Sequence, residues 1–563
     1  MIEINSDTRL ANPDVNFRVS AGPGAGKTHW LVNHILGIIQ QPKRLGKLGK
    51  VACLTFTNIA ADTVTRRLGA ASSGCNVGTV HSFLYHNVVK PYVGFVAVEL
   101  GIDPKKIDGY DETIVSNFNF LQDWKKATQQ TYLLDNAALA AALAAMWWTL
   151  DENGDTVLAK KPNRFIKVNG KYLRKGSGLT YKKMAWERGV VHPDDVIFFS
   201  LKILERNAFI FSILRARFPY LFVDEFQDSS PLQVKIFQDF ATHGIFVGII
   251  GDTAQSIYGF NGASPTDFAN FNAPNIADYV ILDNRRSSNE IIKLLNSIRS
   301  DVQQKSVRNV NFGVPEILVG NKIAAQTYVK QQVGNADFVM LSRNNETVRE
   351  LTGKDFSNTA SVNLLSAMAS NDSNYQRRET VRAIIVGIVQ AQTLGLCYAV
   401  SNAKKVLELS MNQELAKRYA IVLILELLDC YSQYESLTLS EFIAFLNKEF
   451  GLAITNLGAG KARTFYDKYL FSDIASKVLP DDKSSNRTIH KSKGDEFDNV
   501  LLFLEETQLD ILISPRIFGK SQEEQRIIYV AFSRARDRLF INVPELSDEQ
   551  KSLLPSTVSV RTV

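Results

Sequence analysis

The chain has 563 residues, more than a single hydrophobic core usually serves, so we expect two to four domains. Hydrophobic residues make up 45% of it and charged residues 22%, which excludes a disordered, collagen-like or disulfide-stapled chain. The net charge of +6 is compatible with a nucleic-acid partner but does not demonstrate one. The four cysteines show no metal-binding or redox spacing, the first residues show no secretory signal, and the most apolar stretch is too short for a bilayer. We therefore expect a cytoplasmic protein without a membrane partner.

Short apolar runs, each followed by turn residues and a helical pattern, predict buried parallel strands along most of the chain. Strands that alternate with helices in this way favour an α/β fold with parallel sheets. The predicted strands are Phe17–Ser20, Val51–Thr55, Tyr220–Val223, Ile245–Gly251, Tyr279–Leu282, Phe338–Leu341, Val500–Leu504 and Leu539–Val543.

Two stretches interrupt this alternation, residues 94–205 and residues 371–479, and both are predicted to be mainly helical insertions. In the first, Ala137–Leu150 is predicted to be a buried helix that ends at two tryptophans. The polar residues 547–563 are expected to form a loosely held tail. The candidate helices of the second insertion are Arg378–Cys397, Asn402–Tyr431 and Leu439–Phe450.

A glycine-rich segment, Ala21-Gly-Pro-Gly-Ala-Gly-Lys27-Thr28, lies between the first predicted strand and a helical pattern. This strand–loop–helix order is the setting that a phosphate-binding loop requires. Its glycines let backbone N–H groups approach phosphate oxygens, and the helix N-terminus adds partial positive charge. We expect Lys27 to reach the β- and γ-phosphates and the Thr28 hydroxyl to hold Mg²⁺. The candidate phosphate-binding residues are Gly22, Gly24, Ala25, Gly26, Lys27 and Thr28.

A second motif, Tyr220-Leu-Phe-Val-Asp224-Glu225-Phe-Gln-Asp228, is an apolar strand that ends in carboxylates. The end of a strand beside a phosphate loop is where a carboxylate must lie to hold the Mg²⁺ ion. Asp224 is the candidate for the metal side, together with Thr28. Glu225 is the candidate base that activates the attacking water.

Six further segments accompany these two motifs, two of them between the phosphate loop and the acidic motif and four after the acidic motif. The complete set is Ala21–Thr28, Leu54–Ala61, Gly78–Phe83, Val223–Asp228, Gly251–Phe260, Asn284–Ser287, Thr488–Phe497 and Tyr529–Ala535. In this order they are similar to motifs I, Ia, Ib and II to VI of the UvrD/Rep-like superfamily 1 DNA helicases. The chain therefore resembles a compact member of superfamily 1A over most of its length.

The resemblance implies two RecA-like lobes with parallel sheets, 1A and 2A, each interrupted by a mainly helical insertion, 1B or 2B. Lobe 1A would comprise residues 1–93 and 206–280, with insertion 1B at 94–205. Lobe 2A would comprise residues 281–370 and 480–546, with a reduced insertion 2B at 371–479 and the tail at 547–563.

The resemblance also implies the roles of individual residues. ATP and Mg²⁺ would bind between the lobes, and Gln255 would sense the γ-phosphate or its water. Arg286 and Arg534 would act as arginine fingers from the second lobe, where planar guanidinium groups suit charge spread over phosphoryl oxygens. Glu496 would contact the ribose. Single-stranded DNA would cross both lobes and contact Thr55, Phe56, Asn58, His81, Ser82, Phe83, Tyr258, Phe260 and His490, with bases stacked on the aromatic rings.

Two residues differ from the family pattern on the adenine side of the nucleotide site. His29 stands where an arginine often follows the phosphate loop, and Arg285 stands where a tyrosine would stack on adenine. The chain is also shorter than the housekeeping helicases, and we expect no nuclease module after motif VI. In size and motif style it resembles the helicase subunits of Gabija-type phage-defence systems, which implies a separate nuclease as a partner.

The leading interpretation is an ATP-dependent helicase or translocase on single-stranded DNA and on single-/double-strand junctions, with 3′→5′ polarity implied by the resemblance. Its setting would be DNA repair, recombination or phage defence. The alternative is a DNA-stimulated ATPase that regulates a separate nuclease without unwinding by itself. A catalytically weak DNA-binding scaffold and a nuclease are further alternatives, but the intact phosphate loop and the absence of a second metal-ligand cluster in the sequence argue against them.

Overall fold

The computed structural model describes residues 1–40, 45–46, 48–107, 109–110, 118–160, 167–168, 170–259, 262–343, 347, 364, 368, 371–372, 374–393, 396, 399–400, 413–478, 486–518 and 522–563. These residues form two compact units. One unit comprises Met1–Arg343 and Ser492–Val563, and the other comprises Asn344–Lys491. Each unit is described by itself below.

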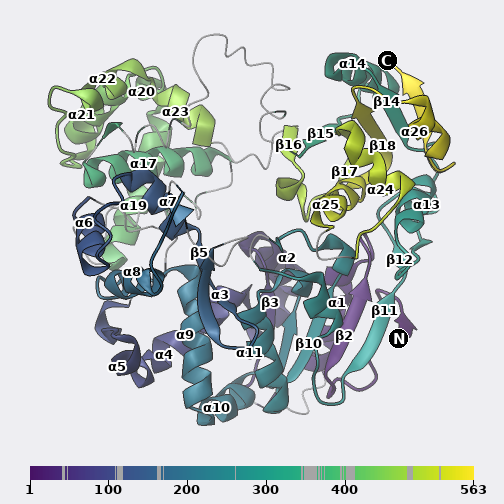
Figure 1. The fold of residues 1–563 in the computed structure, drawn as a ribbon, viewed down its shortest axis with the longest axis horizontal. Coiled ribbons are helices and arrows are strands. Elements are labelled where there is room, and N and C mark those ends of the chain that lie inside the picture. The colour runs from purple at the N-terminus through teal and green to yellow at the C-terminus, as the bar shows by residue number, and fades with distance from the viewer. Residues whose placement is uncertain are drawn as a thin grey trace. The chain divides into compact units, whose positions relative to one another are not determined.

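The first unit contains a parallel sheet of seven strands in the order β1-β11-β2-β10-β9-β3-β4 (Figure 1). Its strands are nearly continuous apolar runs because helices cover both faces, as parallel sheets require. Alternate residues of one strand therefore join different cores: Cys53 packs with helix α1 (Lys27–Gln40), whereas Leu54 packs with α9 (Pro193–Arg206) and α11 (Pro231–Thr242). The strands are β1 (Ile2–Ile4), β2 (Phe17–Ala21), β3 (Val51–Thr55), β4 (Cys75–Thr79), β9 (Tyr220–Val223), β10 (Phe246–Gly251) and β11 (Ala277–Ile281).

A second parallel sheet of the same unit has the strand order β15-β17-β18-β14-β19. Helices α13 (Asn289–Ile298) and α25 (Glu523–Phe532) belong to this part of the chain. The two sheets confirm the predicted α/β fold with parallel strands. All eight predicted strands are present, and the largest difference is at the start of β18. The strands are β14 (Glu316–Val319), β15 (Val339–Ser342), β17 (Phe497–Phe503), β18 (Ala535–Val543) and β19 (Ser559–Thr562).

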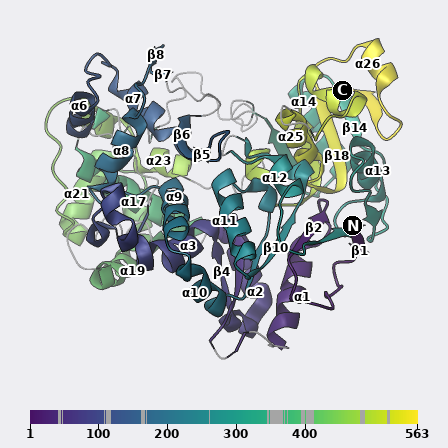
Figure 2. The ribbon, with the colours of Figure 1, turned by 60° about the horizontal axis from the view of Figure 1, so that its bottom comes forward.

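The tail at 547–563 is not loosely held, which corrects the prediction from its polar composition. Helix α26 (Asp548–Leu553) is followed by β19, which pairs in parallel with β14 over four residues. Figure 2 shows the C-terminus beside β14 and β18. The side chains of β19 are largely exposed, so the backbone ladder rather than an apolar face fixes this edge strand.

The region between β4 and β9 is mainly helical, as predicted, but it also contains two hairpins. The predicted helix over 137–150 is wrong in its second half: helix α7 (Asn136–Ala144) ends before the tryptophans, and β5 (Met146–Leu150) pairs antiparallel with β6 (Thr156–Lys160). Trp148 fixes this hairpin, since its Nε1 donates to Asp195 at 2.8 Å and its ring stacks on Phe198 at 3.7 Å between centroids. These tertiary contacts stabilise a strand over residues 146–150, although the apolar sequence pattern is also compatible with a helix.

The second unit has its own hydrophobic core, formed by helices α17 (Tyr375–Thr393), α19 (Gln413–Asp429), α21 (Leu439–Phe450), α22 (Lys461–Lys468) and α23 (Phe471–Val478). The predicted helix Leu439–Phe450 is confirmed to the residue, because Thr438 and Glu441 form a capping box and Gly451 ends the helix in the left-handed conformation. The predicted helix from Asn402 is seen only from residue 413, since residues 401–412 lie outside the described part of the chain.

Candidate nucleotide-hydrolysis site

The glycine-rich loop joins β2 to α1, as the sequence predicts. Gly24 and Gly26 have φ angles of 69° and 80°, which side chains other than glycine rarely tolerate. Helix α1 begins at Lys27, and the amide of Trp30 donates to the Gly26 carbonyl at 2.9 Å to close its first turn. The Lys27 ammonium donates to the Ala21 carbonyl at 3.4 Å, so its charge lies over the loop.

Residues that lead into the second sheet pack directly against this loop. A Cβ atom on Gly24 would lie 2.6 Å from Cβ of Arg286, and one on Gly22 would lie 2.6 Å from the amide nitrogen of Gln304. The amide of Arg285 donates to the Gly24 carbonyl at 2.9 Å. Gly24 combines this close approach with a positive φ, so only glycine fits there, whereas at Gly22 the end of the Gln304 side chain would have to move.

Asp224 lies at the carboxyl end of β9, beside the first turn of α1. The Thr28 hydroxyl donates to its Oδ2 at 3.3 Å, and the Glu225 amide donates to its Oδ1 at 3.0 Å. Burial and the charge of Glu225 raise the pKa of Asp224 to about 6, against the opposing effect of Lys27. A cation at this carboxylate would favour its ionised form.

Glu225 has a φ of 53°, which is unusual for a residue with a side chain and marks a constrained position. Its Oε2 accepts a hydrogen bond from Nε2 of Gln227 at 2.5 Å. Burial alone would raise the pKa of Glu225, but the charges of Lys27 and Lys493 outweigh it and lower the pKa to about 2. Glu225 is therefore ionised at neutral pH and is held as a fixed acceptor.

The donor set fits a nucleoside triphosphate with Mg²⁺. The Thr28 hydroxyl and the Asp224 carboxylate are hard oxygen donors 3.3 Å apart, the type of ligand that Mg²⁺ takes together with phosphate oxygens. The positive φ angles of Gly24 and Gly26 and the start of α1 at Lys27 give the loop the backbone conformation of an anion-binding turn.

Gln255 and the two predicted arginine fingers meet at the side of the second sheet. Nη2 of Arg534 donates to Oε1 of Gln255 at 3.1 Å. Arg286 lies close by, with its Nε donating to Glu496 at 2.8 Å and its Nη1 to the Ser533 carbonyl at 3.1 Å. Burial and the charge of Arg286 lower the pKa of Arg534 to about 9. An anion that binds both guanidinium groups would relieve this repulsion.

Lys493 and Asp228 were not predicted to have a role, yet they form a buried ion pair that joins the two sheets. Nζ of Lys493 lies 2.6 Å from Oδ2 of Asp228 and donates to the Gln255 carbonyl at 2.8 Å. Burial raises the pKa of Asp228 to about 7, although the charge of Lys493 opposes this shift. The ammonium also lies 4.6 Å from the ring centroid of Tyr258. Both residues lie inside segments that resemble helicase motifs, and this position was the sequence feature that could have indicated a role for them.

The adenine-side candidates surround one carboxylate. Asp7 accepts from Arg285 Nη2 at 2.8 Å and lies 2.9 Å from Nε2 of His29. The hydrogen bond with His29 and the charge of Arg285 lower the pKa of Asp7. All three side chains are about half exposed, so they could contact the base of a bound nucleotide. Glu496, predicted at the ribose, is half exposed and accepts from Arg286 Nε at 2.8 Å, and its contact with the ribose stays a prediction.

The aromatic candidates for stacking on nucleic-acid bases divide into two groups. The rings of Phe56 and Tyr258 stack on each other with centroids 5.0 Å apart, and both are partly exposed. Phe83 is buried and packs edge-on against Phe218 at 5.1 Å. Because a base cannot reach a buried ring, we assign Phe83 to the core and withdraw it from the predicted DNA contacts.

The polar DNA-contact candidates occupy helix starts near β3 and β4. Asn58 is exposed at the start of α2 (Asn58–Leu68), and His81 and Ser82 are partly buried in α3 (Val80–Leu84). Thr55 is buried, and its hydroxyl donates to the Thr57 carbonyl at 2.9 Å, so it supports the turn from inside. Phe260 lies outside the described residues, and His490 belongs to the second unit.

One other cluster has the composition of a metal site. His192, Asp194 and Asp195 bring ligand atoms within 4.8 Å of one another. Nζ of Lys182 lies 2.9 Å from Asp194 and 2.8 Å from Asp195, so an internal cation already neutralises the carboxylates. We assign this buried group to the support of the hairpin that carries Trp148. Among the described helices, none has the length and apolar character needed to cross a membrane.

Two family descriptions match the sequence. The UvrD/REP helicase N-terminal domain matches residues 5–275, and the UvrD-like helicase C-terminal domain matches residues 472–545. Gabija protein GajB of Bacillus cereus is 22% identical, over 86% of this chain and 84% of that protein. DNA helicase II of Haemophilus influenzae is 26% identical, over 54% of this chain and 41% of the relative. PcrA of Bacillus subtilis, an ATP-dependent DNA helicase, is 23% identical, over 52% of this chain and 38% of that protein. The chain thus spans most of the Gabija relative but less than half of these two helicases.

Proposed function

Because the chain belongs to the UvrD/Rep-like helicase family, we propose that it is an ATP-driven motor that moves 3′→5′ on single-stranded DNA and opens duplex junctions. Its parallel sheets would be the two RecA-like lobes 1A and 2A, with insertions 1B and 2B at the predicted boundaries. Hydrolysis at the site between the sheets would drive a hinge motion between the lobes.

The glycine-rich loop and the first acidic residue would hold the nucleotide. Backbone N–H groups of Gly22 to Gly26 and the Lys27 ammonium would bind the phosphates, while Thr28 and Asp224 would hold Mg²⁺. When bound, Mg²⁺ would neutralise negative charge on the phosphates. His29 and Arg285 would lie beside the base together with Asp7.

The remaining residues would assist the attack of water on the γ-phosphate. The ionised Glu225 carboxylate would accept the proton of that water, and Gln255 would orient it. Arg534 and Arg286 would stabilise the charge on the phosphoryl oxygens. The observation that carries this proposal is the 3.1 Å contact between Gln255 and Arg534, because it brings together the predicted sensor of one sheet and the predicted finger of the other.

DNA would be gripped by the stacked pair Phe56 and Tyr258, with Asn58, His81 and Ser82 contacting the backbone. Phe260 and His490 stay predicted contacts. Lys493 supports a direct link between this grip and hydrolysis, because it touches the Tyr258 ring, Asp228 and Gln255.

The test is ATP hydrolysis with and without single-stranded DNA, followed by strand displacement on duplexes with a 3′ or a 5′ tail. We expect DNA-stimulated hydrolysis and unwinding from the 3′ tail. Unwinding of the 5′-tailed duplex alone would overturn the proposed polarity. An ATP hydrolysis rate that is the same with and without single-stranded DNA would overturn the proposed motor function.

A second function is favoured by the similarity to Gabija protein GajB, which extends over most of both chains. In that reading the chain is a DNA-stimulated ATPase that regulates a separate nuclease in phage defence. Strand displacement by the purified chain, with and without a candidate partner nuclease, separates the two functions. Unwinding by the chain alone favours the motor, whereas hydrolysis without unwinding favours the regulatory subunit.

A further inference from the structure

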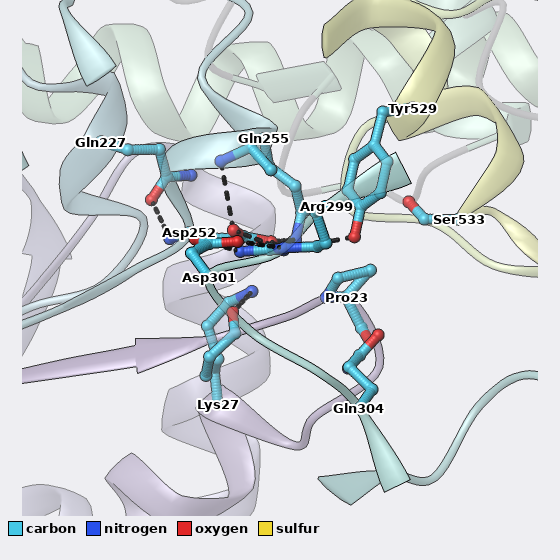
Figure 3. A network of polar contacts seen from close by, with 12 residues as sticks. Pro23, Lys27, Gln227, Asp252, Gln255, Arg299, Asp301, Gln304, Tyr529 and Ser533 are labelled. Carbon is cyan, nitrogen blue, oxygen red and sulfur yellow. Dashed lines mark hydrogen bonds and ion pairs between the residues drawn. The ribbon is translucent and has the colours of Figure 1, made fainter. Parts of the chain in front are cut away.

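Arg299 is a buried arginine outside every motif that the sequence analysis identified. It follows helix α13 directly, and its side chain is 1% exposed. Its Nη1 lies 2.9 Å from Oδ1 of Asp252, whose side chain is also 1% exposed. Asp252 follows β10 of the first sheet, whereas α13 belongs to the part of the chain that builds the second sheet. The ion pair therefore joins the two halves of the proposed motor (Figure 3).

Asp252 connects this ion pair to both residues proposed to act on the attacking water. Its Oδ2 accepts from Nε2 of Gln255 at 2.7 Å. Its backbone amide donates to Oε1 of Gln227 at 3.0 Å, and Nε2 of Gln227 donates to Glu225 at 2.5 Å. Arg299 is thus two contacts from Gln255 and three from Glu225, through side chains that are nearly all buried.

Contacts on the other side hold the Arg299 guanidinium in one orientation. Asp301 accepts two hydrogen bonds from it, at 2.7 and 2.8 Å, in a bidentate arrangement. Nη1 also donates to the hydroxyl of Tyr529 at 3.2 Å. Tyr529 lies on α25, the helix that ends just before Arg534. The same guanidinium therefore contacts the helix that directly precedes the proposed arginine finger.

We propose that Arg299 is a positioning residue that couples the second sheet to Gln255 and Glu225 through Asp252. The proposal rests on the proposed ATPase function and adds a regulatory contact to it. When Asp252 is paired with Arg299, its carboxylate is fixed and holds the Gln255 amide toward Arg534. Without Arg299, the buried Asp252 carboxylate would lose its cationic partner and rearrange, so its contact with the Gln255 amide would loosen. The contact with Gln227 comes from the Asp252 backbone amide and would weaken only as far as that turn shifts.

A merely structural ion pair would predict a different outcome, and the second unit supplies the matched control. There Arg377 makes a bidentate contact with the buried Asp372, at 2.6 and 2.9 Å, and Tyr466 donates to Asp372 at 2.9 Å. This arginine–aspartate–tyrosine group resembles the one at Arg299 in burial and contacts, but no described contact links it to the nucleotide site. Arg377→Met should therefore affect stability and leave turnover unchanged.

The experiment compares Arg299→Met, Arg299→Lys and Arg377→Met in the full chain, by ATP turnover with saturating single-stranded DNA and by thermal unfolding. We expect Arg299→Met to lower kcat by about tenfold or more while KM for ATP changes by less than about twofold. Arg299→Lys should recover part of kcat, because it restores the charge without the fork. Tyr529→Phe, which removes only the hydroxyl contact, should lower kcat by about threefold and covers the case in which Arg299→Met does not fold.

A folded Arg299→Met variant with wild-type kcat would overturn the coupling role, as would an equal loss of kcat in Arg377→Met. If Arg299→Met does not fold, wild-type kcat in both Tyr529→Phe and Arg299→Lys would overturn it instead. Absence of hydrolysis by the wild-type chain, with every DNA tested, would overturn the proposed function itself and the coupling role with it.

Discussion

Replacing the proposed catalytic base tests the hydrolysis mechanism most directly. Glu225→Gln keeps the shape of the side chain, and Gln227 can still donate to the new amide oxygen. The native carboxylate has a pKa of about 2 and is ionised at neutral pH, whereas an amide cannot accept a proton. Loss of a positioned base costs about 10²- to 10⁴-fold, so we expect kcat to fall at least about 100-fold, or ~2.7 kcal/mol.

Nucleotide binding should survive the same substitution. The Glu225 amide that donates to Asp224 is a backbone group and stays in place. The charge of Glu225 raises the pKa of Asp224, so its removal makes the proposed Mg²⁺ ligand easier to ionise. KM for ATP with Mg²⁺ should therefore stay constant or decrease.

The assay is steady-state and single-turnover ATP hydrolysis with saturating single-stranded DNA, beside equilibrium binding of a labelled nucleotide. Glu524→Gln is the matched control, since it removes one glutamate charge from the same unit at a half-exposed ion pair with Arg343. Turnover by Glu225→Gln at more than about one third of the wild-type rate would refute the assignment of the base. A raised KM with unchanged kcat would instead make Glu225 a binding residue.

Three further substitutions test the phosphate loop, the DNA grip and the buried ion pair. Lys27→Ala should lower kcat by about 100-fold or more, measured as DNA-stimulated hydrolysis, because it removes a charge at the phosphates. Tyr258→Ala should lower the affinity for single-stranded DNA by ~1–3 kcal/mol, measured by anisotropy, with DNA-independent hydrolysis retained. In native Asp228 the pKa of about 7 exceeds the unfolded value near 3.8, so its contribution to stability is complete below pH 4 and is lost as pH rises through 7. Asp228→Asn should abolish this decrease in stability between pH 4 and 7. The measurement is the free energy of unfolding of the variant and the wild type as a function of pH.

Features that depend on a few consecutive residues could be predicted from the sequence. The phosphate loop needs a buried strand, glycines with positive φ and a helix start, and the segment from Phe17 to Trp30 supplies all three in order. The acidic motif likewise needs only an apolar strand that stops at a carboxylate. Because parallel strands end at the same edge of a sheet, these two motifs had to approach each other once the sheet order was set.

Features decided by distant partners could not be predicted in this way. Residues 146–150 form a strand because Thr156–Lys160 pairs with them and Asp195 holds Trp148. The tail is ordered because β14 offers an open edge more than 200 residues earlier in the chain. Phe83 lies in a DNA-contact motif, yet its ring turns inward against Phe218. In each case the residue type fits both outcomes, and packing selects one of them.

The charges around the site explain why the electrostatic environment of the catalytic residues depends on contacts between the two sheets. Glu225 and Asp224 come from the first sheet. Burial and the charge of Glu225 raise the pKa of Asp224, whereas the charges of Lys27 and Lys493 outweigh burial and lower the pKa of Glu225. Arg534 comes from the second sheet, and its lowered pKa reflects burial beside Arg286. Moving the sheets apart would return both sets of groups toward water and take the charges of Lys493 and Arg534, which lower the pKa of Glu225, away from it. A polyphosphate that binds both arginines and Lys27 favours the close arrangement, so binding and closure stabilise each other, and hydrolysis removes that stabilisation.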